Sequence, residues 1–164
     1  MVLKIVVQSL FLTFLLLFVS SCTSATDKHV APDRIQVPIL HALGGDFPVA
    51  QLDVLPVGQR ISPVGYIGSQ QQLEALLQHL DGVGTSVLQA VDFPTELVLF
   101  ARNTRFYNRL SIGRVTLAGD TLEVLSMSTM SARPIEDKVA MSLVVINKGR
   151  ARFVSVNGEK VELR

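Results

Sequence analysis

An apolar segment at the amino terminus decides how much of this chain is available to fold as a domain. Lys4 is followed by residues 5–18, which are almost entirely apolar, and then by two small residues at positions 20 and 21. This order is typical of a secretory signal peptide. The apolar run is short for a spanning helix, which needs about 20 residues. We therefore expect removal of residues 1–21, with an amino-terminal membrane anchor as the alternative.

Cys22 directly follows the small residues Ser20 and Ser21. The segment resembles the lipobox of bacterial lipoproteins. The resemblance implies that the thiol receives a diacylglyceryl unit and that cleavage frees its amino group for a further acyl chain. Two or three buried acyl chains give stable anchoring, so we expect the mature chain to be held on a membrane through lipid on Cys22.

The residues after Cys22 predict where the domain begins and where it is anchored. The residue after the cysteine is Thr23 and not aspartate, which in Gram-negative lipoproteins resembles the default outer-membrane destination. Residues 22–34 are small and polar, and we interpret them as the lipidated cysteine and a flexible tether. Residues 35–164 are then a single globular domain in the cell envelope, facing the periplasm.

Composition excludes several classes of protein. Cys22 is the only cysteine, so no intramolecular disulfide and no multi-cysteine zinc site is possible. The net charge is +1, which argues against a nucleic-acid partner. The chain has no Trp, so it is poorly supplied for stacking on carbohydrate.

One helix is clearly predicted. Ser69 and Gln72 have the spacing of a capping box, in which the serine hydroxyl accepts from the third backbone N–H and Gln72 reaches back. Leucines then recur at helical spacing and form one apolar face, at positions 73, 76, 77 and 80. Gly82 and Gly84 are expected to end the helix.

The rest of the domain is predicted to be mainly β. Residues 35–58 are broken by proline and glycine and indicate one or two short extended pieces. Residues 61–67 predict a strand, and the apolar run 97–101 predicts one buried on both faces. The alternation changes parity at Gly113, which indicates a β-bulge. Further strands are expected at 121–127 and 139–146, followed by a hairpin at Asn157-Gly158.

These elements predict an α+β domain that is mainly β, with one helix packed on an antiparallel sheet or a small β-sandwich. Their order resembles the PrcB-type carboxy-terminal domain, a family named for a protein that stabilises a surface protease complex. The resemblance covers residues 60–146 and rests on short motifs: the helix after Ser69, Val91-Asp92-Phe93, the strand at 96–100 and Ser111-Ile112.

One segment departs from that family. Asn108-Arg109-Leu110 stands where a Gly-Gly-Tyr or similar sequence is expected, so whatever the family binds there is not transferred to this chain. The resemblance as a whole implies a protein-binding or assembly-stabilising module and no catalysis.

A search for catalytic and metal-binding patterns gives no strong candidate. The histidines at 29, 41 and 79 lack metal-ligand spacing, and no serine lies in a Gly-x-Ser-x-Gly elbow. Asp92 and Glu96 could be paired carboxylates, but Asp92 before a strand is better interpreted as satisfying loop N–H groups. We therefore expect no enzyme activity, no metal and no cofactor.

The segment 102–114 is the most distinctive surface candidate, because arginines alternate with aromatics and no acid lies among them. Arginines and aromatic residues are over-represented at protein interfaces. The candidate contact residues are Arg102, Arg105, Phe106, Tyr107 and Arg109. The alternative is a solvated loop whose arginines pair with nearby acids and whose Phe106 packs into the core. Stretches 126–131 and 133–138 are secondary candidates.

Two functions follow from these observations. The first is a non-catalytic lipoprotein module that binds an envelope protein and stabilises a protease or other complex, with residues 102–109 as the contact surface. The second is a small-ligand or cell-wall binder, whose arginines hold carboxylates of peptidoglycan or phosphates of lipopolysaccharide.

Overall fold

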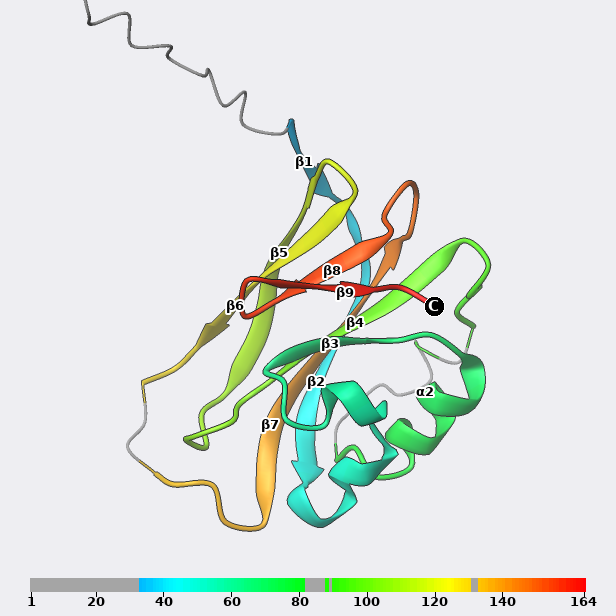
Figure 1. Ribbon diagram of the computed structural model, residues 1–164. Helices are drawn as coiled ribbons and strands as arrows, with labels where there is room; N and C mark the ends of the chain where they lie inside the picture. The colour runs from blue at the N-terminus through cyan, green and yellow to red at the C-terminus, as the bar shows by residue number, and fades with distance from the viewer. Residues whose placement is uncertain (1–32, 82–87, 89, 131–132) are drawn as a thin grey trace, which may run out of the picture. The chain divides into compact units, whose positions relative to one another are not determined.

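The computed structural model describes residues 33–81, 88, 90–130 and 133–164. These residues form one α-helix, two short 3-10 helices and two β-sheets (Figure 1). The strands are β1 (Arg34–Val37), β2 (Ile39–Pro48), β3 (Val64–Ile67), β4 (Glu96–Arg102), β5 (Leu110–Ala118), β6 (Thr121–Ser128), β7 (Lys138–Asn147), β8 (Phe153–Val156) and β9 (Glu159–Glu162). The helices are η1 (Val49–Val54), η2 (Val57–Gln59) and α2 (Gln70–Leu77).

The two sheets have different strand orders. One has five strands in the order β1-β5-β6-β8-β9, and the other has four in the order β2-β7-β4-β3. All pairs are antiparallel except β6 with β8, which is parallel. The prediction of a mainly β domain with one helix and antiparallel-rich sheets is confirmed.

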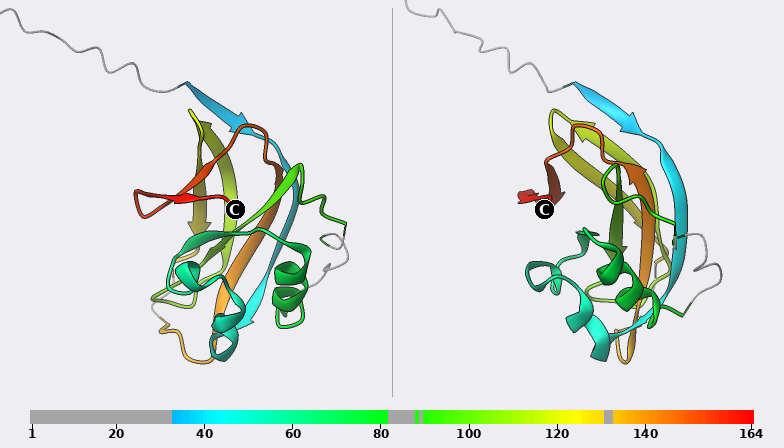
Figure 2. Two further views of the ribbon diagram at one scale, coloured as in Figure 1. Left: turned by 45° about the vertical axis from the view of Figure 1, so that its right-hand side comes forward. Right: turned by 90° about the vertical axis from the view of Figure 1, so that its right-hand side faces the viewer.

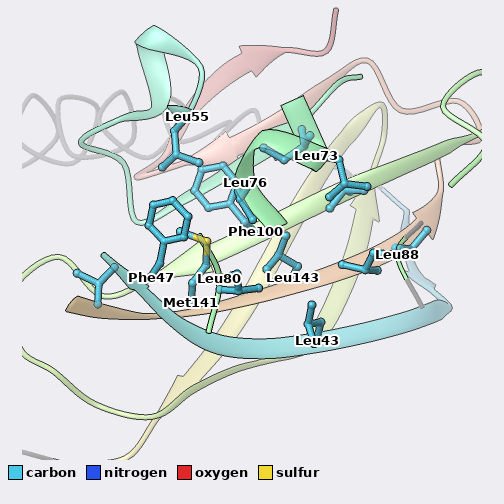
Figure 3. Close-up of a cluster of buried hydrophobic side chains, with 14 residues drawn as sticks. Leu43, Phe47, Leu55, Leu73, Leu76, Leu80, Leu88, Phe100, Met141 and Leu143 are labelled. Atoms are coloured by element: carbon cyan, nitrogen blue, oxygen red, sulfur yellow. The ribbon is translucent and has the colours of Figure 1, made fainter. Parts of the chain in front are cut away.

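The four-stranded sheet is the centre of the domain because it is buried on both faces. Alternate residues of β4 point to opposite sides, so Val98 and Phe100 enter one core and Leu97 and Leu99 enter the other. The first core lies between this sheet and α2 and includes Leu73, together with the other side chains drawn in Figure 3. The second core fills the space between the two sheets. The prediction for 97–101 is therefore confirmed.

The segment before Val49 is more regular than its composition predicts. β1 pairs with β5 in one sheet, and after Pro38 the chain continues as β2, which pairs with β7 in the other sheet (Figure 2). The one or two extended pieces expected here are present as β1 and β2, but β2 is ten residues long and runs through Gly44 and Gly45, so the expected break at these glycines is wrong. β1 also begins at Arg34, the last residue of the predicted tether.

A close approach between two chain segments explains Gly45. The Asp46 N–H donates to the Asp81 carbonyl at 3.0 Å, and the Asp81 N–H donates back at 2.8 Å. A Cβ on Gly45 would lie 2.4 Å from the Asp81 carbonyl oxygen. Glycine is therefore needed here for packing.

The start of α2 is capped nearly as predicted. Ser69 Oγ accepts from the Gln72 N–H at 3.3 Å, whereas Gln72 Oε1 accepts from the N–H of Gly68, one residue before the expected partner, at 3.1 Å. Leu73 and Leu76 are buried against the sheet. The predicted end of the helix at Gly82 and Gly84 lies outside the described residues.

Two local predictions in the second half of the domain, the bulge at Gly113 and the hairpin at Asn157-Gly158, are confirmed. The register of β5 against β6 shifts between Ile112 and Arg114, which places the bulge at Gly113. Gly119 has a φ of +64° in the turn before β6. Asn157 and Gly158 have φ values of 52° and 86° in the hairpin between β8 and β9, as a two-residue turn with positive φ requires.

The signal-peptide and lipidation predictions concern residues 1–22, which lie outside the described residues. Within the part of the chain that the structure describes, no helix has the length and apolar character needed to cross a membrane.

Candidate functional site

The predicted contact residues lie between β4 and β5, where the chain leaves one sheet and enters the other. Arg102 is the last residue of β4, and Arg105, Phe106, Tyr107 and Arg109 lie in the connection. We call residues 103–109 the arginine loop. The structure brings four of the five residues to or near the surface and buries Arg102.

Hydrogen bonds hold the arginine loop at several points. The Asn103 N–H donates to the Ala140 carbonyl at 3.2 Å, and the Asn103 side-chain amide donates to the Asn108 carbonyl at 2.5 Å. The Tyr107 N–H donates to the Arg133 carbonyl at 2.9 Å. Phe106 forms an isolated β-bridge with Pro134. The loop backbone is therefore bonded to β7 and to residues 133 and 134.

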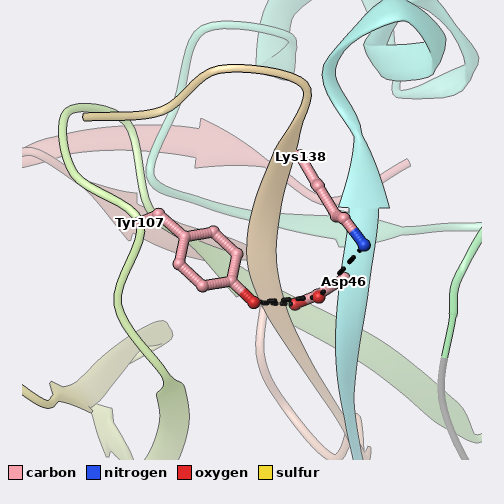
Figure 4. Close-up of polar contacts among 3 residues, drawn as sticks. All are labelled: Asp46, Tyr107 and Lys138. Atoms are coloured by element: carbon pink, nitrogen blue, oxygen red, sulfur yellow. Dashed lines mark hydrogen bonds and ion pairs between the residues drawn. The ribbon is translucent and has the colours of Figure 1, made fainter. Parts of the chain in front are cut away.

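A side-chain contact joins Tyr107 of the loop to Asp46 of β2. The Tyr107 hydroxyl lies 2.8 Å from each carboxylate oxygen of Asp46 and donates its proton to that carboxylate (Figure 4). Lys138 Nζ, at the start of β7, lies 3.8 Å from Asp46 Oδ2. Three elements of the domain thus meet at one carboxylate, and the aromatic ring fixes the loop against β2.

This environment changes the acidity of the tyrosine. The hydrogen bond to Asp46 raises the pKa of Tyr107, burial and the negative charge of Asp46 raise it further, and the charges of Arg133 and Arg109 lower it in part. The guanidinium carbon of Arg133 lies 5.9 Å from the ring centroid, a cation–π distance. The shift favours the neutral phenol, which donates its hydrogen bond to Asp46.

Arg102 has a structural position. It is 6% exposed. Its backbone N–H donates to the Pro63 carbonyl at 2.8 Å, and its guanidinium donates to the Arg60 carbonyl. Burial lowers its pKa. Its Nε has no hydrogen-bond partner among the described residues. Arg102 connects β4 to the segment before β3 and does not join the surface made by the other candidates.

Phe106 lies on the surface. Its side chain is 49% exposed, so the alternative in which Phe106 packs into the core is wrong. Arg105 and Arg109 beside it are also exposed, and so are Glu136 and Asp137 in the segment before β7. Exposed basic groups thus lie on the arginine loop, and exposed acidic groups lie on the segment that follows Pro134, the residue paired with Phe106.

A polar cleft lies next to the Asp46–Tyr107 contact. Its volume is about 340 Å³. It is lined by Gly44, Gly45, Asp46, Asp81, Tyr107, Arg109, Leu110, Ala140 and Met141. Carboxylates and a guanidinium thus share one cleft. The sequence does not predict this combination, because its residues come from four separate segments, at 44–46, 81, 107–110 and 140–141.

A second cleft, of about 600 Å³, lies beside Tyr66 and the start of α2. The Tyr66 hydroxyl donates to the Glu162 carbonyl at 2.8 Å and accepts from the Arg164 N–H at 3.1 Å. The Gln59 side chain is buried there and accepts from the Tyr66 N–H at 2.6 Å. These bonds hold the carboxyl-terminal residues against β3.

The other residues considered for chemistry have structural contacts. The Asp92 carbonyl accepts from the N–H groups of Thr95 and Glu96, while its carboxylate accepts from the Thr95 hydroxyl at 2.6 Å. We expected the Asp92 carboxylate to accept from the loop N–H groups. The Asp92 backbone carbonyl accepts from them instead. The His79 ring packs edge-on against Phe47 at 6.4 Å. Within the described ranges, no group of three or more His, Cys, Asp or Glu residues is arranged to hold a metal ion.

Comparisons with known proteins do not add a relative. No family model, no curated protein and no solved structure matches the chain.

Proposed function

We propose that this chain is a lipid-anchored envelope protein whose globular domain is a non-catalytic protein-binding module. The observation that carries the proposal is the 49% exposure of Phe106 on a loop fixed by hydrogen bonds. A large apolar side chain that remains in water on an ordered loop contributes little to the core. An aromatic ring beside arginines has the composition that interfaces favour, and this combination supports a binding surface.

The fixed conformation of the arginine loop favours binding. Association of a mobile loop loses conformational entropy, whereas a loop already held by Asp46 and Arg133 has lost most of that freedom on folding. Arg105 adjoins Phe106, and arginine can form paired hydrogen bonds with carboxylates. The partner we infer has an apolar pocket for the Phe106 ring with a carboxylate at its edge.

The remaining parts of the proposal come from the sequence. Lipid on Cys22 anchors the domain in the cell envelope, at the outer membrane facing the periplasm. Residues 23–33 act as a tether that separates the domain from the membrane surface. The resemblance to the PrcB-type domain stays a prediction, and it favours a partner that is a protease or another envelope complex.

The experiment is crosslinking in living cells that make the full chain, followed by affinity capture and mass spectrometry. The test variant is Arg105→Glu with Phe106→Ser, which removes the exposed ring and reverses the adjacent charge without touching Tyr107. The matched control is Arg150→Glu with Ile61→Ser, since Arg150 is exposed and Ile61 is 88% exposed elsewhere.

We expect one envelope protein to be captured in stoichiometric amount by the native chain and by the control, and to be lost with the test variant. Equal recovery with both variants, or no specific protein with the native chain, rejects the arginine loop as the contact surface. A Cys22→Ser chain of unchanged size and membrane association rejects the lipid anchor.

The cleft beside Tyr107 favours a second candidate, binding of a small ligand or of the cell wall. Arg109 can bind a carboxylate or phosphate, and Asp81 can bind an ammonium group, so a peptidoglycan stem peptide carries suitable groups for both. Sedimentation with purified wall or lipopolysaccharide tests this candidate. Binding that is lost with Arg109→Gln but retained with Arg105→Glu/Phe106→Ser would assign the cleft and not the loop.

A further inference from the structure

The parallel pairing of β8 leaves most of β6 with a partner on one side only. β6 pairs with β5 along its length, but with β8 only at Thr121 and Leu122. Beyond Leu122 it runs past the end of that pairing (Figure 1). Among the described residues, no strand pairs with the far side of residues 123–128.

The direction of the β6 backbone groups follows from one observed bond. The Thr129 N–H donates to the Arg109 carbonyl, on the β5 side. Successive residues of a strand direct their N–H and C=O groups to opposite sides. Met127 and Leu125 therefore direct theirs toward β5. Val124, Ser126 and Ser128 direct theirs away from β5, toward the side without a strand.

The side chains of this edge are apolar and uncharged. Leu125 is 48% exposed and Met127 is 57% exposed. They alternate with Ser126 and so lie on the same face of the sheet. Residues 124–130 contain no charged residue and no proline. Natural sheets usually protect an exposed edge with lysine, proline or a covering segment.

We propose that this edge pairs with the same edge of a second copy of the chain, in an antiparallel arrangement about a two-fold axis at Ser126. In this register Ser126 exchanges both backbone hydrogen bonds with Ser126 of the other copy, and Val124 pairs with Ser128. Each Leu125 then lies beside Met127 of the other copy at a non-hydrogen-bonded pair, where side chains approach most closely.

Charge and symmetry favour a second copy as the occupant. A two-fold interface places identical segments side by side, so any net charge within the segment would repel itself. The segment 124–130 has none. In the two-fold register the apolar Leu125 faces the apolar Met127, and Ser126 faces Ser126 of the other copy. The nearest acid, Glu123, lies outside the pairing and is bonded to Arg34 at 3.3 Å. This edge meets the arginine loop where the Thr129 N–H bonds to the Arg109 carbonyl, but the inference uses neither Phe106 nor Arg105 and does not depend on the proposed function.

The first test is photo-crosslinking in cells that make the full chain, with a photoreactive residue at position 126. The matched control has it at position 116, because Thr116 lies in β5 on the same sheet but between two strands. We expect a product of twice the mass, containing only this chain, from position 126 and not from 116. A product with another protein, or the absence of a doubled product, overturns the proposal.

The second test measures self-association of the purified full chain in detergent by sedimentation equilibrium. Leu125→Lys with Met127→Lys sets like charges against each other across the axis, and we expect the dissociation constant to rise by at least about tenfold. Thr116→Lys should leave it unchanged. Ser126→Pro, which removes an N–H that β5 does not use, should weaken association in the same way. An unchanged dissociation constant in either edge variant, with a native circular dichroism spectrum, overturns the proposal.

Discussion

The Tyr107 hydroxyl lies 2.8 Å from both carboxylate oxygens of Asp46, a residue 61 positions earlier in the chain. One side-chain contact thus fixes the arginine loop to β2. The contact is partly exposed, so its contribution to stability is moderate, but its contribution to the shape of the loop is large.

We expect Tyr107→Phe to lower the free energy of unfolding by about 1 kcal/mol, because it removes one hydrogen bond to a charged group at a partly exposed site. Denaturant unfolding measures this change. Combination with Asp46→Asn in a double-mutant cycle should give a smaller effect than the sum of the single changes. Additive effects would contradict a direct coupling.

The same contact predicts a pH dependence in the alkaline range. The pKa of Tyr107 is raised in the folded state above its ordinary value of 10.0, mainly by the hydrogen bond to Asp46. A raised pKa contributes stability that is complete below the unfolded pKa and is lost as the pH rises through the folded pKa. The native chain should therefore lose its advantage over Tyr107→Phe above about pH 10. A difference that stays constant from pH 8 to 11 would refute this assignment.

Two adjacent glycines should respond differently to the same substitution. A Cβ on Gly45 would lie 2.4 Å from the Asp81 backbone, whereas a Cβ on Gly44 meets nothing closer than 3.8 Å. We expect Gly45→Ala to destabilise the fold by about 2 kcal/mol through forced separation of β2 from Asp81. Gly44→Ala, the matched control, should change stability by less than about 0.5 kcal/mol. Equal thermal shifts for the two variants would exclude the close approach.

The buried Arg102 should tolerate an apolar replacement of similar length. Arg102→Met keeps the packing of the stem and removes a buried charge, so its stability should stay within about 1 kcal/mol of native. Arg102→Ala leaves a cavity and should cost about 2 kcal/mol. Neither variant should alter partner capture, since Arg102 is 6% exposed. Loss of partner capture by a folded Arg102→Met variant would contradict this prediction and show that Arg102 belongs to the contact surface.

The features that sequence predicts correctly are those determined by neighbouring residues. The turn at Asn157-Gly158 requires two positive φ angles, the bulge at Gly113 follows from a change in alternation, and Ser69 caps a helix that starts at the next residue. Each depends on contacts within a few positions.

The features that sequence does not predict depend on distant segments. β2 continues through Gly44-Gly45 because β7 pairs with it and Asp81 approaches it closely. Arg102 is one of five similar candidates by composition, and only its place at the end of a central strand buries it. Phe106 is exposed because its loop is held through Tyr107 and Asn103. Alternation shows which face a residue is on but not which strand lies next to it.

The separation of β1 from β2 by Pro38 determines how the domain responds to tension. A pull on the chain before Arg34 acts first on the four residue pairs between β1 and β5. We expect these pairs to open one after another from Arg34, and opening to stop at Pro38, where the chain enters the longer pairing with β7. Release of β1 would lengthen the extended chain before the central sheet by roughly 14 Å, while the central sheet stays intact. We therefore expect the first strand to detach under tension before the core unfolds.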